Sequence, residues 1–171
     1  QEMEYLALYV DDIIIAAPSP EKLKDIKEGL ESAFSLKEIG TISNLLGMNV
    51  GKMDEGGLSI HQPKIIRALM EETSGLGFRS TPMGRVDLKP HQDKATQEEI
   101  KEFQANIGTL LYLSRKSRPD ITYAVCALAR SSSNPSPIAA RALEWLVGYI
   151  QHTPDYQLAI RGGGMDIVGW S

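Results

Sequence analysis

The sequence Tyr9-Val10-Asp11-Asp12 joins two short apolar runs, Leu6-Ala7-Leu8 before it and Ile13-Ile14-Ile15 after it. Aspartate is disfavoured in strands and favoured in turns, so this arrangement predicts a β-hairpin with the Asp-Asp step at its tip. Both carboxylates would then project from one rigid corner. Such a corner suits a hard cation such as Mg²⁺, which binds one or two protein carboxylates together with water and substrate phosphates. A solvated turn without a ligand fits the tetrapeptide as well.

The composition is typical of a globular protein. The 171 residues are 42% hydrophobic, which suffices for one domain or a pair of small ones. No apolar run approaches the ~20 residues that span a bilayer, and the first residues lack the pattern of a signal peptide, so no membrane partner is expected. The single cysteine, Cys126, excludes an internal disulfide. Its apolar surroundings predict a core position on a helix, and a reducing intracellular setting is consistent with this.

Charge is distributed unevenly along the chain. The net charge is −4, but residues 1–60 carry 5 basic and 11 acidic side chains, whereas residues 101–171 carry 7 and 5. Acidic residues therefore gather in the part of the chain that holds the Asp-Asp step. Cations cluster at Arg115-Lys116-Ser117-Arg118, where they can hold phosphates or form an ordinary solvated surface.

Apolar periodicity predicts the elements of the first half of the chain. Residues 43–52 predict one strand, residues 54–57 a turn and residues 58–60 a returning strand. A later helix would begin at Pro63 and end before Gly75. An earlier helix would begin at Ser19-Pro20 and carry a core stripe of Leu23, Ile26, Leu30 and Phe34.

The second half predicts a linker, a helical bundle and a further sheet. Residues 80–95 have no apolar period and contain prolines and a glycine, so we expect a linker there. A capping box at Thr96-Gln97-Glu98-Glu99 and first-turn prolines at Pro119 and Pro137 predict three amphipathic helices. The tail, residues 156–168, predicts two strands. The fold class is therefore α+β.

Six segments of the chain carry recognisable motifs, and they span nearly its whole length. In order, they are Tyr9–Ala16, Ser35–Gly40, Leu46–Val50, Ser80–Met83, Ile107–Ser114 and Arg118–Ile121. In this order and spacing they closely resemble the reverse transcriptase of Ty1/copia-type LTR retrotransposons.

The resemblance implies the back half of a right-handed polymerase. Residues 1–79 would form a partial palm of β-hairpins with packed helices, residues 80–95 a linker and residues 96–152 a helical thumb. Residues 153–171 would form a connection and the first strands of an RNase H-like domain, without nuclease activity. Because the chain starts and stops within predicted strands, we expect a piece of a Pol polyprotein that lacks the upstream palm and the fingers.

The resemblance also implies an active site. Asp11 and Asp12 would help to hold two Mg²⁺ ions, which support nucleotidyl transfer to a primer 3′-hydroxyl. Lys37 falls in a motif with a basic residue near the leaving phosphate, so it is a candidate general acid unless it only pairs with Glu38 or solvent. The implied partners are an RNA or DNA template-primer and a dNTP.

Further residues are candidates for nucleic-acid contact. The resemblance implies that Tyr9 and Val10, which precede the Asp-Asp step, lie against the primer end and the nucleotide. The segment 46–48 resembles the primer grip, a hairpin that positions the 3′-terminus, although its glycine also fits a β-bulge. With the basic cluster included, the candidates are Tyr9, Val10, Leu46, Gly47, Met48, Arg115, Lys116 and Arg118.

The last predicted thumb helix departs from the family's pattern. Where relatives usually carry Lys and Arg, this chain has Glu144, Trp145, Gly148 and Gln151. Each lost phosphate contact would reduce by ~0.9 the slope of the logarithm of the binding constant against the logarithm of the salt concentration. We therefore expect weaker binding of template and primer.

Three hypotheses for function follow. The first is a fragment of an RNA-directed DNA polymerase that is inactive alone, because another catalytic aspartate and the fingers are missing. The alternative is a non-catalytic nucleic-acid- or protein-binding module derived from a retroelement. The third is a translated relic that does not fold stably, because a half palm would expose a sheet edge.

Overall fold

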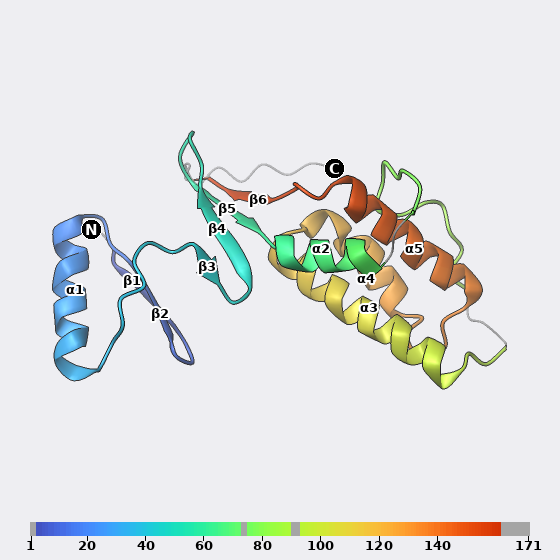
Figure 1. Ribbon diagram of the computed structural model, residues 1–171, viewed down its shortest axis with the longest axis horizontal. Coiled ribbons are helices and arrows are strands. Elements are labelled where there is room, and N and C mark those ends of the chain that lie inside the picture. The colour runs from blue at the N-terminus through green and yellow to red at the C-terminus, as the bar shows by residue number, and fades with distance from the viewer. Residues whose placement is uncertain (1–2, 73–74, 90–92, 162–171) are drawn as a thin grey trace. The chain divides into compact units, whose positions relative to one another are not determined.

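The computed structural model describes residues 3–72, 75–89 and 93–161 (Figure 1). The chain separates into two compact units, Gln1–Ile42 and Ser43–Ser171. Helices and antiparallel strands occur in both units, which confirms the α+β class. No helix in the described ranges is long and apolar enough to cross a membrane.

The first unit begins with the predicted hairpin. Strand β1 (Tyr5–Tyr9) pairs antiparallel with strand β2 (Asp12–Ala16), and Tyr9 lies opposite Asp12. The two residues between them, Val10 and Asp11, therefore form the turn. The Asp-Asp step is at the tip, as the sequence predicts.

Helix α1 (Pro20–Ala33) follows the hairpin and begins as predicted. The Ser19 hydroxyl accepts a hydrogen bond from the Lys22 amide at 3.3 Å. The prediction of a core stripe on this helix is wrong, because none of residues 3–42 is buried and Leu23 and Phe34 are 37% and 61% exposed. One hairpin and one helix provide too few layers to enclose a side chain.

Four antiparallel strands form the sheet of the second unit within its described residues. In the order of pairing they are β3 (Asn44–Leu45), β4 (Met48–Lys52), β5 (Leu58–His61) and β6 (Leu158–Ile160). The single strand predicted over residues 43–52 is wrong, because the chain turns at residues 46 and 47. The hairpin through residues 54–57 is confirmed. The second predicted strand of the tail, around residues 167–168, lies outside the described residues.

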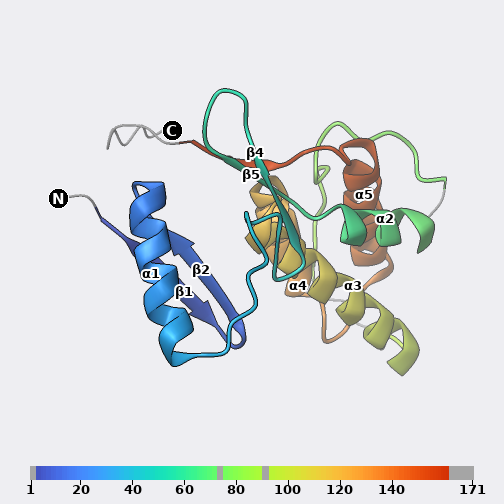
Figure 2. The same ribbon diagram turned by 60° about the vertical axis from the view of Figure 1, so that its left-hand side comes forward.

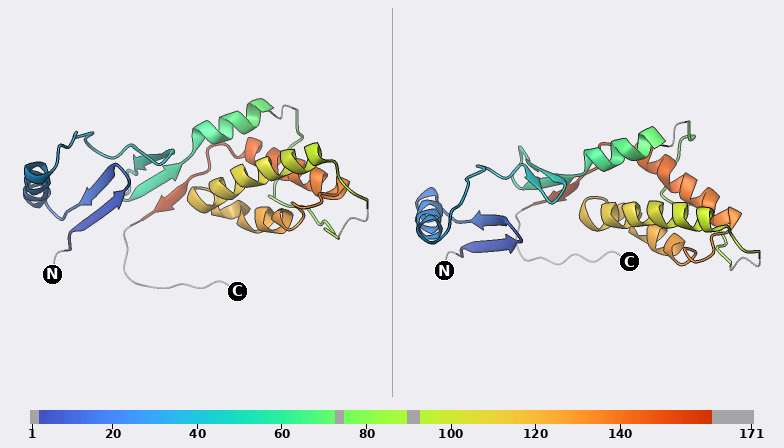
Figure 3. Two further views of the ribbon diagram at one scale, coloured as in Figure 1. Left: turned by 90° about the horizontal axis from the view of Figure 1, so that it is seen from below. Right: turned by 60° about the horizontal axis from the view of Figure 1, so that its bottom comes forward.

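Strand β6 joins this sheet from a distant part of the chain. It pairs with β5, with Leu58 opposite Ile160, and the two strands lie side by side in Figure 3. Gly57 precedes β5 with a φ of 99°, and a Cβ atom there would overlap the Ile160 carbonyl oxygen. Only glycine permits this close approach of the two backbones.

Helices make up the rest of the second unit. They are α2 (Pro63–Glu72), α3 (Gln97–Lys116), the 3₁₀ turn η1 (Pro119–Ile121), α4 (Thr122–Ala129) and α5 (Pro137–His152). Helix α4 contacts both α3 and α5, and α2 packs against α5 (Figure 2). Fully buried side chains such as Leu110, Leu128 and Leu146 form the core between them. The predicted three-helix bundle is confirmed.

The helix starts agree closely with the sequence signals. At α3, the Thr96 hydroxyl accepts a hydrogen bond from the Glu99 amide at 3.2 Å, and the Glu99 carboxylate accepts one from the Thr96 amide at 2.7 Å. This is the predicted capping box. Pro137 opens α5 as predicted, whereas Pro119 opens a 3₁₀ turn that leads into α4.

Cys126 does not occupy the predicted core position. Its side chain is exposed, although α4 buries Ala124, Val125 and Leu128. Helical spacing of three and four residues places these three on one side of α4, and Cys126 falls on the other side.

Candidate active site and nucleic-acid interface

The tip of the first hairpin presents two adjacent carboxylates. Asp11 lies in the turn and Asp12 opens β2, and both are exposed. Within the described residues, neither carboxylate has a hydrogen-bond or ion-pair partner. Both are therefore available to an external cation.

The backbone of the tip is strained at Val10. This residue has a φ of 51°, and its side chain is 79% exposed. A β-branched residue in the left-handed region costs of order 1–3 kcal/mol, and such strain is concentrated at functional sites. Sequence reasoning missed this feature. Its signal is a valine at a turn position where a two-residue hairpin loop normally has glycine or asparagine.

The donor chemistry of the tip fits part of a Mg²⁺ site. Two carboxylates supply hard oxygen ligands, and Mg²⁺ is commonly held by one or two carboxylates plus substrate phosphates. No group of three His, Cys, Asp or Glu residues that could hold a metal occurs in the described parts of the chain. The hairpin therefore offers Asp11 and Asp12 as a partial ligand set.

Lys37 lies in an exposed segment without helix or strand. Its neighbour Glu38 pairs with Lys27 of α1 instead, with Nζ 2.5 Å from Oε2, and this hydrogen bond raises the pKa of Lys27. Among the described residues, the structure shows no contact between Lys37 and Asp11 or Asp12. Within the described part of the chain, Lys37 therefore does not pair with Glu38.

The β3–β4 turn is attached to helix α3. Leu46 and Gly47 have φ values of 48° and 76°, the pattern of a tight type I′ hairpin turn. Gly47 is therefore a turn glycine rather than a bulge glycine. The Tyr112 hydroxyl on α3 donates a hydrogen bond to the Leu46 carbonyl, and Met48 is buried at the start of β4. Sequence reasoning missed this contact of Tyr112.

The basic cluster at the end of α3 divides into two parts. Arg115 is exposed and Lys116 is half-buried in the last turn, where positive charge is favourable beside the helix carboxyl end. Arg118, in contrast, is 1% exposed. The surface position expected for Arg118 is therefore wrong, and charge from Arg115 and Lys116 alone in this cluster reaches solvent.

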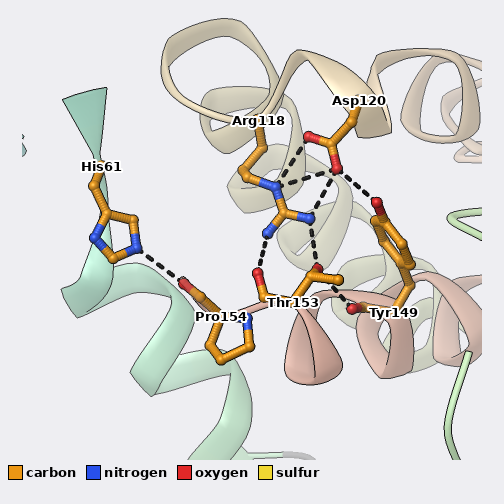
Figure 4. A network of polar contacts seen from close by, with 6 residues as sticks. All are labelled: His61, Arg118, Asp120, Tyr149, Thr153 and Pro154. Atoms are coloured by element: carbon orange, nitrogen blue, oxygen red, sulfur yellow. Dashed lines mark hydrogen bonds and ion pairs between the residues drawn. The ribbon is translucent and has the colours of Figure 1, made fainter. Parts of the chain in front are cut away.

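Figure 4 shows what holds the Arg118 side chain. Its Nη2 atom lies 2.8 Å from the Asp120 Oδ2 atom, and its Nη1 donates to the Thr153 carbonyl at 2.9 Å. The Tyr149 hydroxyl donates to the same Asp120 oxygen at 3.0 Å. The network therefore fastens the end of α3 to the end of α5.

The network shifts the pKa values of its members. Burial of Asp120 raises the pKa of this carboxyl, but the hydrogen bond and the charge of Arg118, together with the hydrogen bonds from Tyr149 and the backbone, bring the pKa below its ordinary value. Burial and the hydrogen bond to Asp120 raise the pKa of Tyr149. Both shifts favour the ionised carboxylate and the neutral phenol that the geometry requires.

The end of strand β5 is connected to the residues around this network. The His61 Nε2 atom lies 2.9 Å from the Pro154 carbonyl oxygen (Figure 4). The buried Gln62 side chain accepts a hydrogen bond from the Ser117 hydroxyl at 2.9 Å. The segment Arg118-Pro119-Asp120, together with Thr153 and Tyr149, thus connects the helices to the sheet, and we call this network the structural joint.

Trp145 and Gly148, two of the α5 residues at which a basic side chain was expected, are covered by this chain itself. The Trp145 indole donates to the Thr81 carbonyl at 2.9 Å, and the Arg79 guanidinium lies 4.3 Å from the Trp145 ring centre. At Gly148, a Cβ atom would lie 3.3 Å from the Gly77 carbonyl oxygen. Residues 76–84 therefore pack on the side of α5 that carries Trp145 and Gly148.

Comparison with known proteins finds similarity to reverse transcriptases and retrotransposon proteins. A family model described as reverse transcriptase (RNA-dependent DNA polymerase) matches residues 3–81. A transposon Ty5-1 protein of Saccharomyces cerevisiae is 29% identical over 93% of this chain and 52% of its own length. A retrovirus-related Pol polyprotein from transposon TNT 1-94 of Nicotiana tabacum is 27% identical over 97% of this chain and 13% of its own. An uncharacterized mitochondrial protein of Arabidopsis thaliana is 30% identical over 86% and 63%.

The chain spans about half the length of the Ty5-1 protein and a much smaller part of the Pol polyproteins. No solved structure matches it. The reverse transcriptase model covers both hairpins that carry the predicted polymerase motifs, and the transposon relatives extend the likeness along nearly the whole chain. These matches support the interpretation of the chain as a fragment of a copia-type retrotransposon reverse transcriptase.

Proposed function

We propose that this chain forms part of the nucleotidyl-transfer machinery of a reverse transcriptase. Residues 1–79 are assigned to the palm, residues 80–95 to a linker and residues 96–152 to a helical thumb. Residues 153–171 are assigned to a connection and the first strands of an RNase H-like domain. The family match over residues 3–81 and the helical bundle after it support this division.

The reaction is transfer of a nucleotidyl group from a dNTP to a primer 3′-hydroxyl. One observation carries the proposal: Asp11 and Asp12 are exposed on a strained turn, have no partner among the described residues, and lie inside the segment matched by the family model. These carboxylates would hold Mg²⁺ in the complete polymerase. When bound, two such ions activate the attacking hydroxyl and stabilise the leaving pyrophosphate.

The other candidate residues bind and orient the substrates. Tyr9 and Val10 flank the carboxylates and would contact the primer end and the nucleotide. The turn at Leu46-Gly47-Met48 would position the primer terminus, and Lys37 would donate a proton to the leaving pyrophosphate. Arg115 and Lys116 would contact the phosphate backbone, whereas the buried Arg118 is left out of the interface.

By itself, this chain is proposed to be inactive as a polymerase. Its hairpin offers two carboxylates, and two-metal chemistry requires more negative charge than they provide. The alternative of a non-catalytic module gains no support from the relatives, several of which are described as Pol polyproteins.

Mn²⁺ binding at the tip tests the catalytic proposal. We expect Mn²⁺, followed by the paramagnetic broadening of NMR signals, to act on residues of the β1–β2 turn. Asp11→Asn and Asp12→Asn should each remove the broadening. Asp25→Asn, which changes an exposed carboxylate on α1, is the matched control and should retain it.

Activity provides the second arm of this test. In a complete polymerase that contains this segment, each variant at Asp11 or Asp12 should abolish nucleotide incorporation, and Asp25→Asn should not. Normal incorporation with asparagine at both positions would contradict the assignment.

A further inference from the structure

A groove of about 740 Å³ lies in the second unit, outside all the residues assigned to catalysis. One wall is the loop of residues 82–89, and the other is helix α4 with the turn of residues 130–134 that follows it. We call this hollow the loop–α4 groove. It is partly open to solvent, so a ligand can enter it.

The loop wall is held in place although it contains no helix or strand. Met83 and Leu88 pack against the helical core. The Thr81 hydroxyl donates to the Met83 carbonyl at 3.3 Å, and the Trp145 indole holds the Thr81 carbonyl. These contacts fix the position of the loop, so the groove is a stable part of the second unit.

The groove is positively charged. Arg85 and Lys89 come from the loop, and Arg130 lies at the end of α4. Lys89 pairs with Asp87 at 2.7 Å, but neither arginine has an ion-pair partner in the described parts of the chain. None of the described residues that line the groove is acidic. Two guanidinium groups without an ion-pair partner among the described residues therefore line the groove, whereas Asp87 balances the charge of Lys89.

An aromatic ring lies beside these charges. Tyr123 of α4 lines the groove and is 77% exposed. Ala127, one helical turn further on, also lines the groove and leaves space next to the ring. An exposed aromatic face beside guanidinium groups is the combination with which proteins bind single-stranded nucleic acid, because bases stack on the ring while cations hold the phosphates.

We propose that the loop–α4 groove binds a segment of single-stranded nucleic acid. Arg85 and Arg130 contact successive phosphates, and Tyr123 stacks on a base. The proposal rests on the proposed function for the class of its partner, and it assigns the contact to residues outside the hairpin tip and the basic end of α3. An acidic peptide would use the arginines but would gain nothing from stacking on Tyr123, so nucleic acid is favoured.

Binding of a fluorescent oligothymidylate to the 171-residue chain, followed by anisotropy at several salt concentrations, tests this proposal. Replacing both arginines (Arg85→Gln with Arg130→Gln) should weaken binding roughly tenfold or more and reduce the salt slope by about 0.7 per arginine. Tyr123→Ala should weaken binding at least about fivefold, whereas Tyr123→Phe should not.

The matched control removes the same charge elsewhere. Arg67→Gln with Lys101→Gln changes two exposed cations on α2 and α3, and we expect binding to be unaffected. Thermal melting followed by circular dichroism checks that each variant folds. Because Tyr123 is exposed and its removal leaves no cavity, Tyr123→Ala tests the groove even if the arginine variant is unstable.

Three results would overturn the proposal. The first is no binding by the parent chain at low salt. The second is unchanged binding in the groove variants together with loss of binding in Arg115→Gln with Lys116→Gln, which would move the contact to the end of α3. The third is equal competition by polyglutamate with no effect of Tyr123→Ala, which would indicate a general anion site. The catalytic proposal is tested by Mn²⁺ at the hairpin tip, so either proposal can fail alone.

Discussion

The two units of this chain differ in how they are stabilised. The first unit holds the candidate catalytic carboxylates, yet none of residues 3–42 is buried. The second unit encloses a core of fully buried side chains between its helices. An isolated two-stranded hairpin is marginally stable in water, whereas packed amphipathic helices support a cooperative fold. The candidate catalytic residues therefore lie in the first unit, which has no buried core, and the structural joint lies in the second unit, which has one.

The largest effect is expected at the joint. Arg118→Ala would leave the partly buried Asp120 without its cation and should reduce the free energy of unfolding by about 3–5 kcal/mol. Arg115→Ala removes an exposed arginine from the same helix end and should change it by less than about 0.5 kcal/mol. Urea unfolding followed by circular dichroism measures both. Equal effects would show that burial of Arg118 contributes nothing special.

Two leucines compare the units directly. Leu146→Ala removes a fully buried side chain of α5 and should cost about 3 kcal/mol. Leu23→Ala lies on α1, where no residue is buried, and should cost less than about 1 kcal/mol. The same urea titration measures both variants. If Leu23→Ala reduced the free energy of unfolding as much as Leu146→Ala, the first unit would have a core of its own, and the two units would not differ in this respect.

The helix caps offer a finer comparison. Thr96→Ala breaks the capping box of α3 and should cost about 1 kcal/mol of the cooperative unfolding transition. Ser19→Ala removes the equivalent cap of α1, and we expect faster amide hydrogen exchange in that helix with the main transition unchanged. A shift of the main transition by Ser19→Ala would mean that both units unfold together.

The smallest effect is the response to acid. The pKa of Asp120 is lowered in the fold, so its contribution to stability is present above the unfolded pKa of about 3.9 and is lost as the pH falls through the lower folded pKa. The melting temperature of the second unit should therefore fall as the pH is lowered from the unfolded pKa of Asp120 to its folded pKa. Asp120→Asn should flatten this dependence, and Asp54→Asn on the β4–β5 turn should leave it intact.

Features set by local interactions were predictable from the sequence. The Asp-Asp hairpin tip, the Ser19 cap and the Thr96 capping box each depend on a few consecutive residues, and the structure confirms all three. The type I′ turn at Leu46-Gly47 was missed because apolar residues on both sides continue a strand pattern through it.

Features set by long-range packing were not predictable. Arg118 is buried only because Thr153, 35 positions along the chain, accepts its hydrogen bonds. Cys126 is exposed because neighbouring helices cover the opposite side of α4. The strain at Val10 is local, but it was missed because apolar periodicity does not show which turn residue takes a positive φ. The functional roles assigned to the site residues stay predictions.

The pairing of β6 with β5 has a consequence for the order of folding on the ribosome. Strand β5 is synthesised before its neighbour Leu158–Ile160, so the four-stranded sheet stays incomplete until the helices between them have been synthesised. With about a hundred residues to add at about 5–20 per second, the edge of β5 would be open for roughly 5–20 s. An unpaired strand edge invites pairing with other chains. During translation, one edge of β5 therefore stays unpaired until the chain has been synthesised through Ile160.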